Sequence, residues 1–261
     1  MNSHLFSENI CFKIILTLFL IMLFVIYIFF ALLTNKKYKK WFLYRYVCWS
    51  IGLLSIGISL VGPLATLAHH NFIGHMITHL LIGMLAPLLI ALSMPVTLLL
   101  RSIDVYNARK LTRILKSRLI QFISNPIIAS LLNIGGLWCL YTTNLYMFMH
   151  HSLFIYILIH FHLFIAGYLF TISIIYVDIT IHKYSYVYRS IILVLALTGH
   201  NILSKYIYAN PPISVDKDEA KIAGMIMYYG GDMVDFIIIL ILCYQWYKKS
   251  TPRFVIDPKK N

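Results

Sequence analysis

The sequence predicts an all-α, polytopic membrane helix bundle of seven transmembrane helices, with the N-terminus outside the cell and the C-terminus in the cytoplasm. Of the 261 residues, 60% are hydrophobic and only 12% are charged, whereas soluble globular proteins carry about 25% charged residues. There is too little polar material to coat a soluble core, so lipid must cover the apolar surface. Two further observations support this class: the apolar residues form long separate stretches, and the basic residues occupy alternate connections between them.

The expected helices follow from the lengths of the apolar stretches, because a helix that crosses the hydrocarbon core needs about 20 mostly apolar residues. The seven expected spans are residues 14–33, 46–67, 76–100, 126–147, 153–175, 189–208 and 222–246. The first is expected to be a retained helix, because its apolar run is too long for a signal peptide and its basic cluster follows it. With no repeat or linker in the sequence, a single integral membrane domain over 1–261 is expected.

The orientation follows from lysine and arginine, which are enriched in cytoplasmic loops. Roughly 18 of the 22 basic residues lie in the segments after the first, third, fifth and seventh expected spans. These segments are therefore predicted to be cytoplasmic. The same placement accounts for the net charge of +13: basic residues beside membrane helices contact anionic lipid, and no nucleic-acid partner is expected.

Histidine is the main ionisable residue in or near the expected spans. Nine of the 11 histidines lie in connections or half-spans on the predicted outer side, and these are His69, His70, His75, His79, His150, His151, His160, His162 and His200. His75 and His79 are one turn apart and so share a helix face. Ionisable groups inside a bilayer are costly and indicate a functional site. The alternative for each one is an interhelical hydrogen bond or a hydrated loop position.

The residue types near the predicted outer leaflet indicate a metal site. Thioether and imidazole together are ligands for Cu(I), and imidazole alone suits Cu(II), zinc or haem iron. The candidate ligands are His75, His79, His160 and His200, which share one depth in the predicted outer leaflet; of the candidates, His200, Met76 and Met227 are the weaker ones. Asp232 and Asp235 lie about halfway through the last expected span. They are predicted either to orient a histidine from behind or to join helices in a polar seam.

Two prolines are expected to distort the third span. Pro87 and Pro95 each remove a backbone hydrogen bond, which frees the carbonyl groups of Gly83 and Ala91. The resulting kink is expected either to open a cavity beneath the histidines or only to shape the packing.

Several catalytic classes are excluded by missing residues. The stretch from His75 to His79 lacks the glutamate of the HExxH metalloprotease motif. The last expected span, 222–246, lacks the lysine that a retinal protein needs. No phosphate-binding loop or nucleophile elbow is present. A non-enzymatic role is therefore expected.

Four stretches together resemble the seven-helix CtaG family, which is associated with assembly of caa3-type cytochrome c oxidase. They are HMITHLLIGMLAPLLIALSMPVTLLLR at 75–101, the segment 125–138 that begins Asn-Pro, His160 with AGYLF at 166–170, and AGMIMY at 223–228. The resemblance covers roughly residues 75–246. Four positions depart from the family pattern, where Tyr141, Thr143 and Tyr156 replace expected His or Pro residues and Glu219 replaces Asp.

The resemblance implies an assembly factor in the cytoplasmic membrane of a bacterium. It would bind copper in the outer leaflet and help to form the Cu(A) centre of the oxidase, with the Cu(A)-bearing subunit as its partner. His75, His79 and His160 are the positions that the resemblance supports best as ligands. Three other roles stay open: a haem-binding redox protein with His79 and His160 as axial ligands, a transporter of copper or another solute that uses Asp232 and Asp235, and a metal-free scaffold.

Overall fold

The computed structural model describes residues 10–180 and 182–251, which form helices and connecting segments without a strand. His4 and the basic residues Arg253, Lys259 and Lys260 lie outside the described residues. Five single helices are long and apolar enough to cross a membrane: α1 (Ile10–Asn35), α2 (Leu43–Leu60), α12 (Leu153–Ile174), α13 (Tyr186–Ala209) and α14 (Lys217–Ser250).

A sixth span is assembled from three consecutive pieces over 72–92, namely α4 (Phe72–Leu80), the π-helical turn η1 (Leu81–Leu85) and α5 (Ala86–Leu92). A seventh is a bent pair. Its first arm consists of α9 (Pro126–Ser130), the π-helical turn η2 (Leu131–Gly135) and α10 (Gly136–Thr142), and its second arm, α11 (Leu145–His151), is turned by 78°. The structure therefore has the predicted all-helical architecture of a multi-pass membrane protein.

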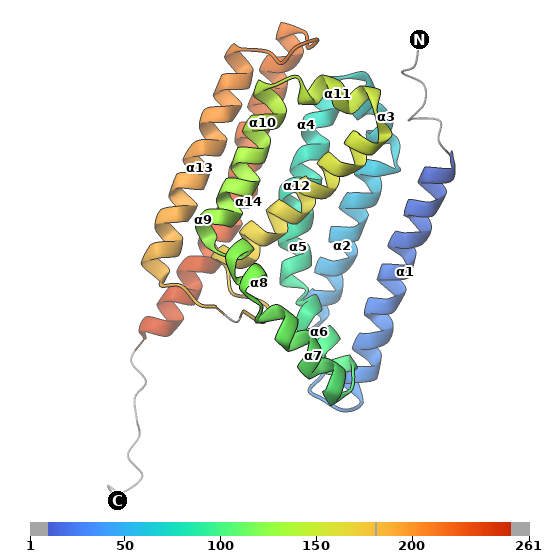
Figure 1. Ribbon diagram of the computed structural model, residues 1–261, viewed down its shortest axis with the longest axis vertical. Helices are drawn as coiled ribbons and strands as arrows, with labels where there is room; N and C mark the ends of the chain where they lie inside the picture. The colour runs from blue at the N-terminus through green and yellow to red at the C-terminus, as the bar shows by residue number, and fades with distance from the viewer. Residues whose placement is uncertain (1–9, 181, 252–261) are drawn as a thin grey trace, which may run out of the picture.

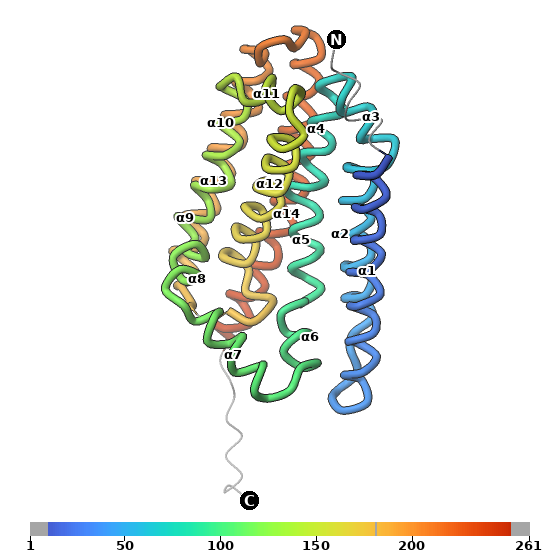
Figure 2. The backbone as a smooth tube through the Cα atoms, turned by 45° about the vertical axis from the view of Figure 1, so that its right-hand side comes forward, coloured from blue at the N-terminus to red at the C-terminus, as the bar shows by residue number. Residues whose placement is uncertain are grey.

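The bundle has two ends of different composition (Figure 1). The histidine end carries α3 (Pro63–His70), α11 and the start of α14. The basic end carries the connection between α1 and α2, the end of α14, and three short helices, α6 (Pro95–Ser102), α7 (Val105–Leu115) and α8 (Arg118–Ile123). The connections that were predicted to be cytoplasmic thus lie together at one end. Figure 2 shows α1 and α2 side by side at one flank of the bundle.

Three expected spans have different bounds because of proline or a local break. The expected helix 46–67 ends at Leu60, since Pro63 opens α3 and Gly62 before it is extended. The expected helix 76–100 begins earlier, at Phe72, and is interrupted at Met94 (φ 56°, ψ 55°) immediately before Pro95. The expected helix 126–147 breaks after Thr142. Arg189, expected to mark a cytoplasmic loop, is 1% exposed and donates to the carbonyl of Ile174.

The predicted kink near Pro87 takes the form of a widened turn. Pro87 is the second residue of α5, directly after η1, where a π-helical turn leaves room for a residue without an N–H group. The helix α12 crosses here at very short range. A Cβ atom added to Gly167 would overlap the carbonyl oxygen of Gly83 and lie 3.1 Å from Cγ of Pro87. The carbonyl that Pro87 frees is therefore covered by the backbone of α12.

Side-chain hydrogen bonds cap the start of one helix at each end of the bundle. At the basic end, the carboxylate of Asp178 accepts hydrogen bonds from the amides of Val96 (2.8 Å) and Thr97 (2.9 Å). It thereby caps α6 after the break at Met94. At the histidine end, Asn71 caps α4 by accepting from the amide of Gly74 at 2.7 Å.

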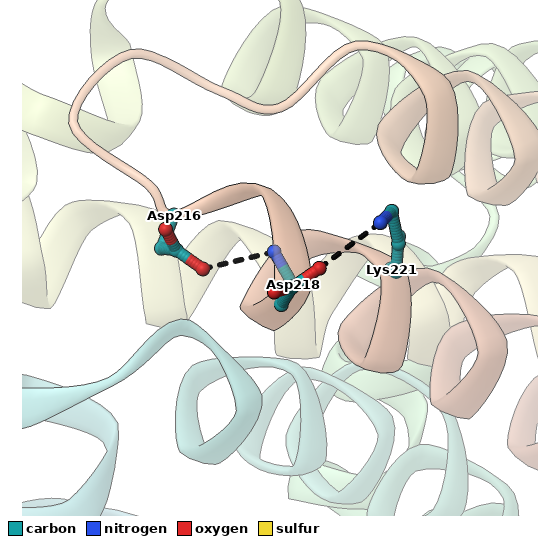
Figure 3. A network of polar contacts seen from close by, with 3 residues as sticks. All are labelled: Asp216, Asp218 and Lys221. Atoms are coloured by element: carbon teal, nitrogen blue, oxygen red, sulfur yellow. Dashed lines mark hydrogen bonds and ion pairs between the residues drawn. The ribbon is translucent and has the colours of Figure 1, made fainter.

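The start of α14 is fixed by a local network and by one contact with α4. Asp216 accepts from the amide of Asp218 at 2.9 Å, and Lys221 pairs with Asp218 at 3.0 Å (Figure 3). Glu219 points elsewhere: its Oε2 atom accepts from the amide of Phe72, the first residue of α4, at 3.1 Å. Glu219 therefore joins the beginnings of two helices that are 147 positions apart in the chain.

Substitution of Glu219 by alanine is expected to lower the stability of the protein by about 1–2 kcal/mol, since a buried helix start loses its acceptor and a negative charge. Thermal unfolding in detergent would measure the change. Asp218→Ala is the matched control, because Asp218 is 84% exposed in its side chain and pairs only locally with Lys221. Equal unfolding temperatures for the two variants would contradict the assigned role of Glu219.

Candidate metal centre

The four candidate histidines lie together in the interior near the histidine end. The exposed fractions are 1% for His75, 1% for His79, 4% for His160 and 2% for His200. They come from three elements, because α4 carries His75 and His79, α12 carries His160, and α13 carries His200. The helix starts described above set their depth, since Asn71 and Glu219 fix where α4 begins.

The rings form two adjoining pairs. The ring centroids of His75 and His160 are 6.3 Å apart, and those of His79 and His200 are 6.2 Å apart. Tyr141 of α10 lies between the pairs, with its ring centroid 5.9 Å from that of His75 and 6.1 Å from that of His79. The convergence of the imidazoles, which the sequence could only suggest, is thus a feature of the fold.

The hydrogen bonds of the two pairs differ. His75 Nε2 shares a hydrogen bond of 3.1 Å with the hydroxyl of Tyr141. His160 Nδ1 donates to the carbonyl of Tyr156 at 2.9 Å. Because a carbonyl oxygen can only accept, this contact places the proton on Nδ1 and leaves the Nε2 lone pair of neutral His160 in the form that binds metals.

The ring nitrogens of the second pair, His79 and His200, make no comparable hydrogen bonds. Among the described residues, neither ring nitrogen of His79 has a hydrogen-bond partner; the ring nitrogens of His200 make no hydrogen bond of good geometry, and the side chain of Asn201 is the polar group beside them. A buried polar group without a partner costs about 1–3 kcal/mol. A ligand that binds these nitrogens would remove that cost, so this pair is the strongest candidate for holding an ion.

Glycines make room for both rings of this pair. A Cβ atom on Gly231 of α14 would overlap Cε1 of His200 and lie 3.0 Å from its Nδ1. A Cβ atom on Gly83 would lie 3.3 Å from Nδ1 of His79. The backbone of α14 therefore packs directly against the His200 imidazole.

A small cavity lies on the basic-end side of His200. Its volume is about 20 Å³, enough for one water molecule. Gly83, Asn133, His200 and Asp235 contribute to its lining. A cavity beneath the histidines was one of the two outcomes expected from the proline-distorted span, and it is present beside the distorted turn.

The remaining candidate residues lie at different distances from the rings. Met76 and Met227 are both fully buried, in the apolar cluster that also contains Tyr141 and Tyr156. Asp235 is 4% exposed and borders the cavity. The Oδ1 atom of Asp232 accepts a hydrogen bond of 3.2 Å from the side-chain Nδ2 of Asn201. This bond makes Asp232 part of a polar contact between α13 and α14, as in the helix-joining alternative.

Three tyrosines also lie against the candidate histidines, and none of them was assigned a role there from the sequence. Tyr156 lies one turn before His160, with the ring centroids 4.2 Å apart. The ring centroid of Tyr146 lies 4.9 Å from that of His75, and the ring of Tyr141 lies beside those of both His75 and His79. Two of these, Tyr141 and Tyr156, stand where the family pattern has histidine. Two signals in the sequence could have identified them: Tyr156 is one helical turn before His160, and Tyr141 and Tyr156 replace histidines of the family pattern.

Within the described residues, no group of three or more His, Cys, Asp or Glu side chains is arranged to hold one metal ion. Two imidazoles on opposite sides of one ion, with metal–nitrogen distances of about 2.0 Å, have ring centroids about 6 Å apart. The spacing of His79 and His200 matches that arrangement, and Cu(I) is an ion that accepts two ligands.

The fold and the buried imidazoles define a class of protein: a polytopic membrane helix bundle with a cluster of buried histidines near one end of the bundle. Residues 25–249 match the family model of the cytochrome c oxidase caa3 assembly factor, Caa3_CtaG. The chain belongs to this family, as its sequence motifs predicted.

Similar proteins occur in mycobacteria. The chain is 25% identical over 236 residues to an uncharacterised protein of Mycobacterium leprae, which covers 81% of this chain and 35% of that protein. It is 30% identical over 153 residues to an uncharacterised protein of Mycobacterium bovis, covering 55% of this chain and 23% of the relative. The matches thus span about a third or less of the relatives' length. No solved structure matches the chain.

Proposed function

We propose that this protein assists assembly of a caa3-type cytochrome c oxidase by holding Cu(I) at His79 and His200 and passing it to the Cu(A)-bearing subunit. The observation that carries the proposal is the fully buried imidazole pair, whose ring nitrogens make no hydrogen bond of good geometry among the described residues. Family membership supports the oxidase as the target. The protein contributes ligands and a dry environment rather than a catalysed reaction.

His75 and His160 supply the next ligands along the path. Their ring pair adjoins the first through Tyr141, and the Nε2 lone pair of His160 is in the metal-binding form. Met76 and Met227 provide thioether ligands of the type that Cu(I) favours, in the same apolar cluster. Copper would move by exchange of one neutral ligand for another, so the ion keeps its oxidation state and no electron is transferred.

The predicted orientation agrees with this role. The basic end is expected to face the cytoplasm, which puts the histidine end at the outer face, where a Cu(A) centre forms. The size of the cavity favours a single ion over haem: about 20 Å³ beside His200 is far smaller than a porphyrin. Asp235 borders that cavity, and Asp232, which is bonded to the side chain of Asn201, supplies a carboxylate near His200.

Copper content is the test of the proposal. Detergent-purified protein is loaded with Cu(I) under reducing conditions, washed with a Cu(I) chelator, and assayed for the metal that remains. Wild type is expected to retain about one copper per chain. His79→Ala/His200→Ala is expected to retain at least tenfold less, and His75→Ala/His79→Ala/His160→Ala likewise.

His182→Ala is the control, because His182 lies between α12 and α13, at the basic end. The same variants are then expressed in cells that lack the gene, and the Cu(A) absorbance of the oxidase is measured. Retained copper that is equal and negligible in all proteins would overturn the copper proposal. A Soret band in purified wild type would favour a haem role, and normal Cu(A) with both histidine variants would favour a metal-free scaffold.

A further inference from the structure

The histidine end has a surface depression with an unusual lining. Its volume is about 270 Å³, and it is open to the exterior of the bundle. The side chains around it whose atoms are of types that can bind a metal ion are His69, His70, His150, His151, Met147 and Glu219. They come from three separate segments, the end of α3, the end of α11 and the start of α14.

Two of these side chains lie close together in the lining of the depression. The ring centroids of His69 and His150 are 5.6 Å apart, with the ring planes at 74°. Nε2 of His150 is buried and has no hydrogen-bond partner in the described part of the chain.

Aromatic rings link this surface pair to the buried imidazoles. The ring centroids of His69 and Tyr156 are 5.5 Å apart, and those of Tyr156 and His160 are 4.2 Å apart. From His150, the ring of Tyr146 lies at 4.8 Å, and His75 lies 4.9 Å beyond it. Both routes therefore reach the pair formed by His75 and His160. No gap between neighbouring ring centroids from the depression to His200 exceeds 6.3 Å.

From this geometry we propose that His69 and His150 form a second Cu(I) site, at the surface, through which the ion enters or leaves the buried pair. The proposal deepens the proposed function and rests on it for the identity of the metal. The two sites differ in what surrounds them. The surface pair opens on a depression wide enough for a donor or acceptor to approach, whereas His79 and His200 are closed off from solvent.

Transfer between the sites is again ligand exchange. An ion held by His69 and His150 would exchange one imidazole for that of His160 or His75 and then proceed to His79 and His200. Each displaced imidazole keeps its lone pair, and no proton or electron has to be transferred. Glu219 contributes its negative charge at the rim while its Oε2 atom stays bonded to the amide of Phe72.

The experiment separates the two sites by removing each in turn. In a His79→Ala/His200→Ala background, which lacks the buried pair, the protein is expected to bind about one Cu(I) that a chelator removes rapidly. Adding His69→Ala/His150→Ala is expected to lower that binding at least tenfold, and adding His182→Ala is expected to leave it unchanged. With the buried pair intact, His69→Ala/His150→Ala is expected to load chelator-resistant copper at least tenfold more slowly than wild type, to the same final content.

The outcomes distinguish this inference from the proposed function. If the His79→Ala/His200→Ala protein binds no copper, or if its copper survives His69→Ala/His150→Ala, the surface site is overturned. If loading of the buried pair is as fast without His69 and His150 as with them, the entry role is overturned while the proposed function stands. If wild type holds only rapidly removed copper that depends on His69 and His150, the surface site stands and the proposed function falls. Circular dichroism and thermal unfolding verify that each variant is folded.

Discussion

Gly167→Ala is expected to abolish stable folding of the bundle, so that little or no monodisperse protein is recovered from detergent. A Cβ atom at this position would overlap the carbonyl oxygen of Gly83 and press on Pro87. The oxygen belongs to the backbone of η1, which cannot swing aside as a side chain would. Overpacking a rigid site of this kind costs about 3 kcal/mol or more, a large part of the stability of an ordinary domain.

The measurement is the yield and the midpoint of thermal unfolding, with Gly135→Ala as the matched control. Gly135 also lies in a π-helical turn, but a Cβ atom there would meet nothing within 4 Å. We expect the control to unfold near the wild-type temperature. A Gly167→Ala protein with wild-type yield and midpoint would show that α12 does not pack on η1 as described.

Gly231→Ala is expected to abolish copper retention without removing any ligand. The new methyl group would lie too close to Cε1 of His200 for both atoms, so the imidazole has to leave its place beside His79. The variant should therefore behave like His200→Ala in the copper assay, with at least a tenfold loss of chelator-resistant metal. Because a side chain rather than backbone must move, the expected stability loss is smaller, about 1–3 kcal/mol.

Gly230→Ala is a close control for this prediction. It changes the neighbouring position of α14 and alters helix propensity in the same way, but its Cβ atom would meet only the flexible end of Leu80. Copper retention in Gly230→Ala should match wild type. Normal retention in Gly231→Ala as well would mean that His200 is not a ligand, and the proposed pair would have to be abandoned.

Sequence composition determined the class of protein and most of its helices. A helix that crosses a membrane must satisfy its own backbone and present apolar residues along its whole length, so its signal is local and can be read directly. The expected spans 14–33, 153–175 and 189–208 agree with α1, α12 and α13, respectively, to within a few residues. The family resemblance, which rested on short motifs, was confirmed by the family model, which matches residues 25–249.

The helix ends were less predictable where proline and polar caps act. The break at Met94 follows from Pro95, and the end of α2 follows from Pro63, yet hydropathy alone ran through both. The early start of α4 depends on Asn71 and on Glu219, which is distant in sequence. A window average of hydropathy does not register a single side chain that caps a helix.

The composition of the site was visible in the sequence, but its pairing was decided by tertiary structure. The histidines stood out because ionisable residues are costly in lipid, and the sequence alone placed them near one face. Which rings meet depends on how α4, α10, α11, α12 and α13 pack around one another. That packing set His79 against His200, put Tyr141 and Tyr156 between the rings, and brought His69 to His150. Helix order in a bundle arises from contacts between residues far apart in the chain, and the close approach of Gly167 to Gly83 is one such contact that no local pattern encodes.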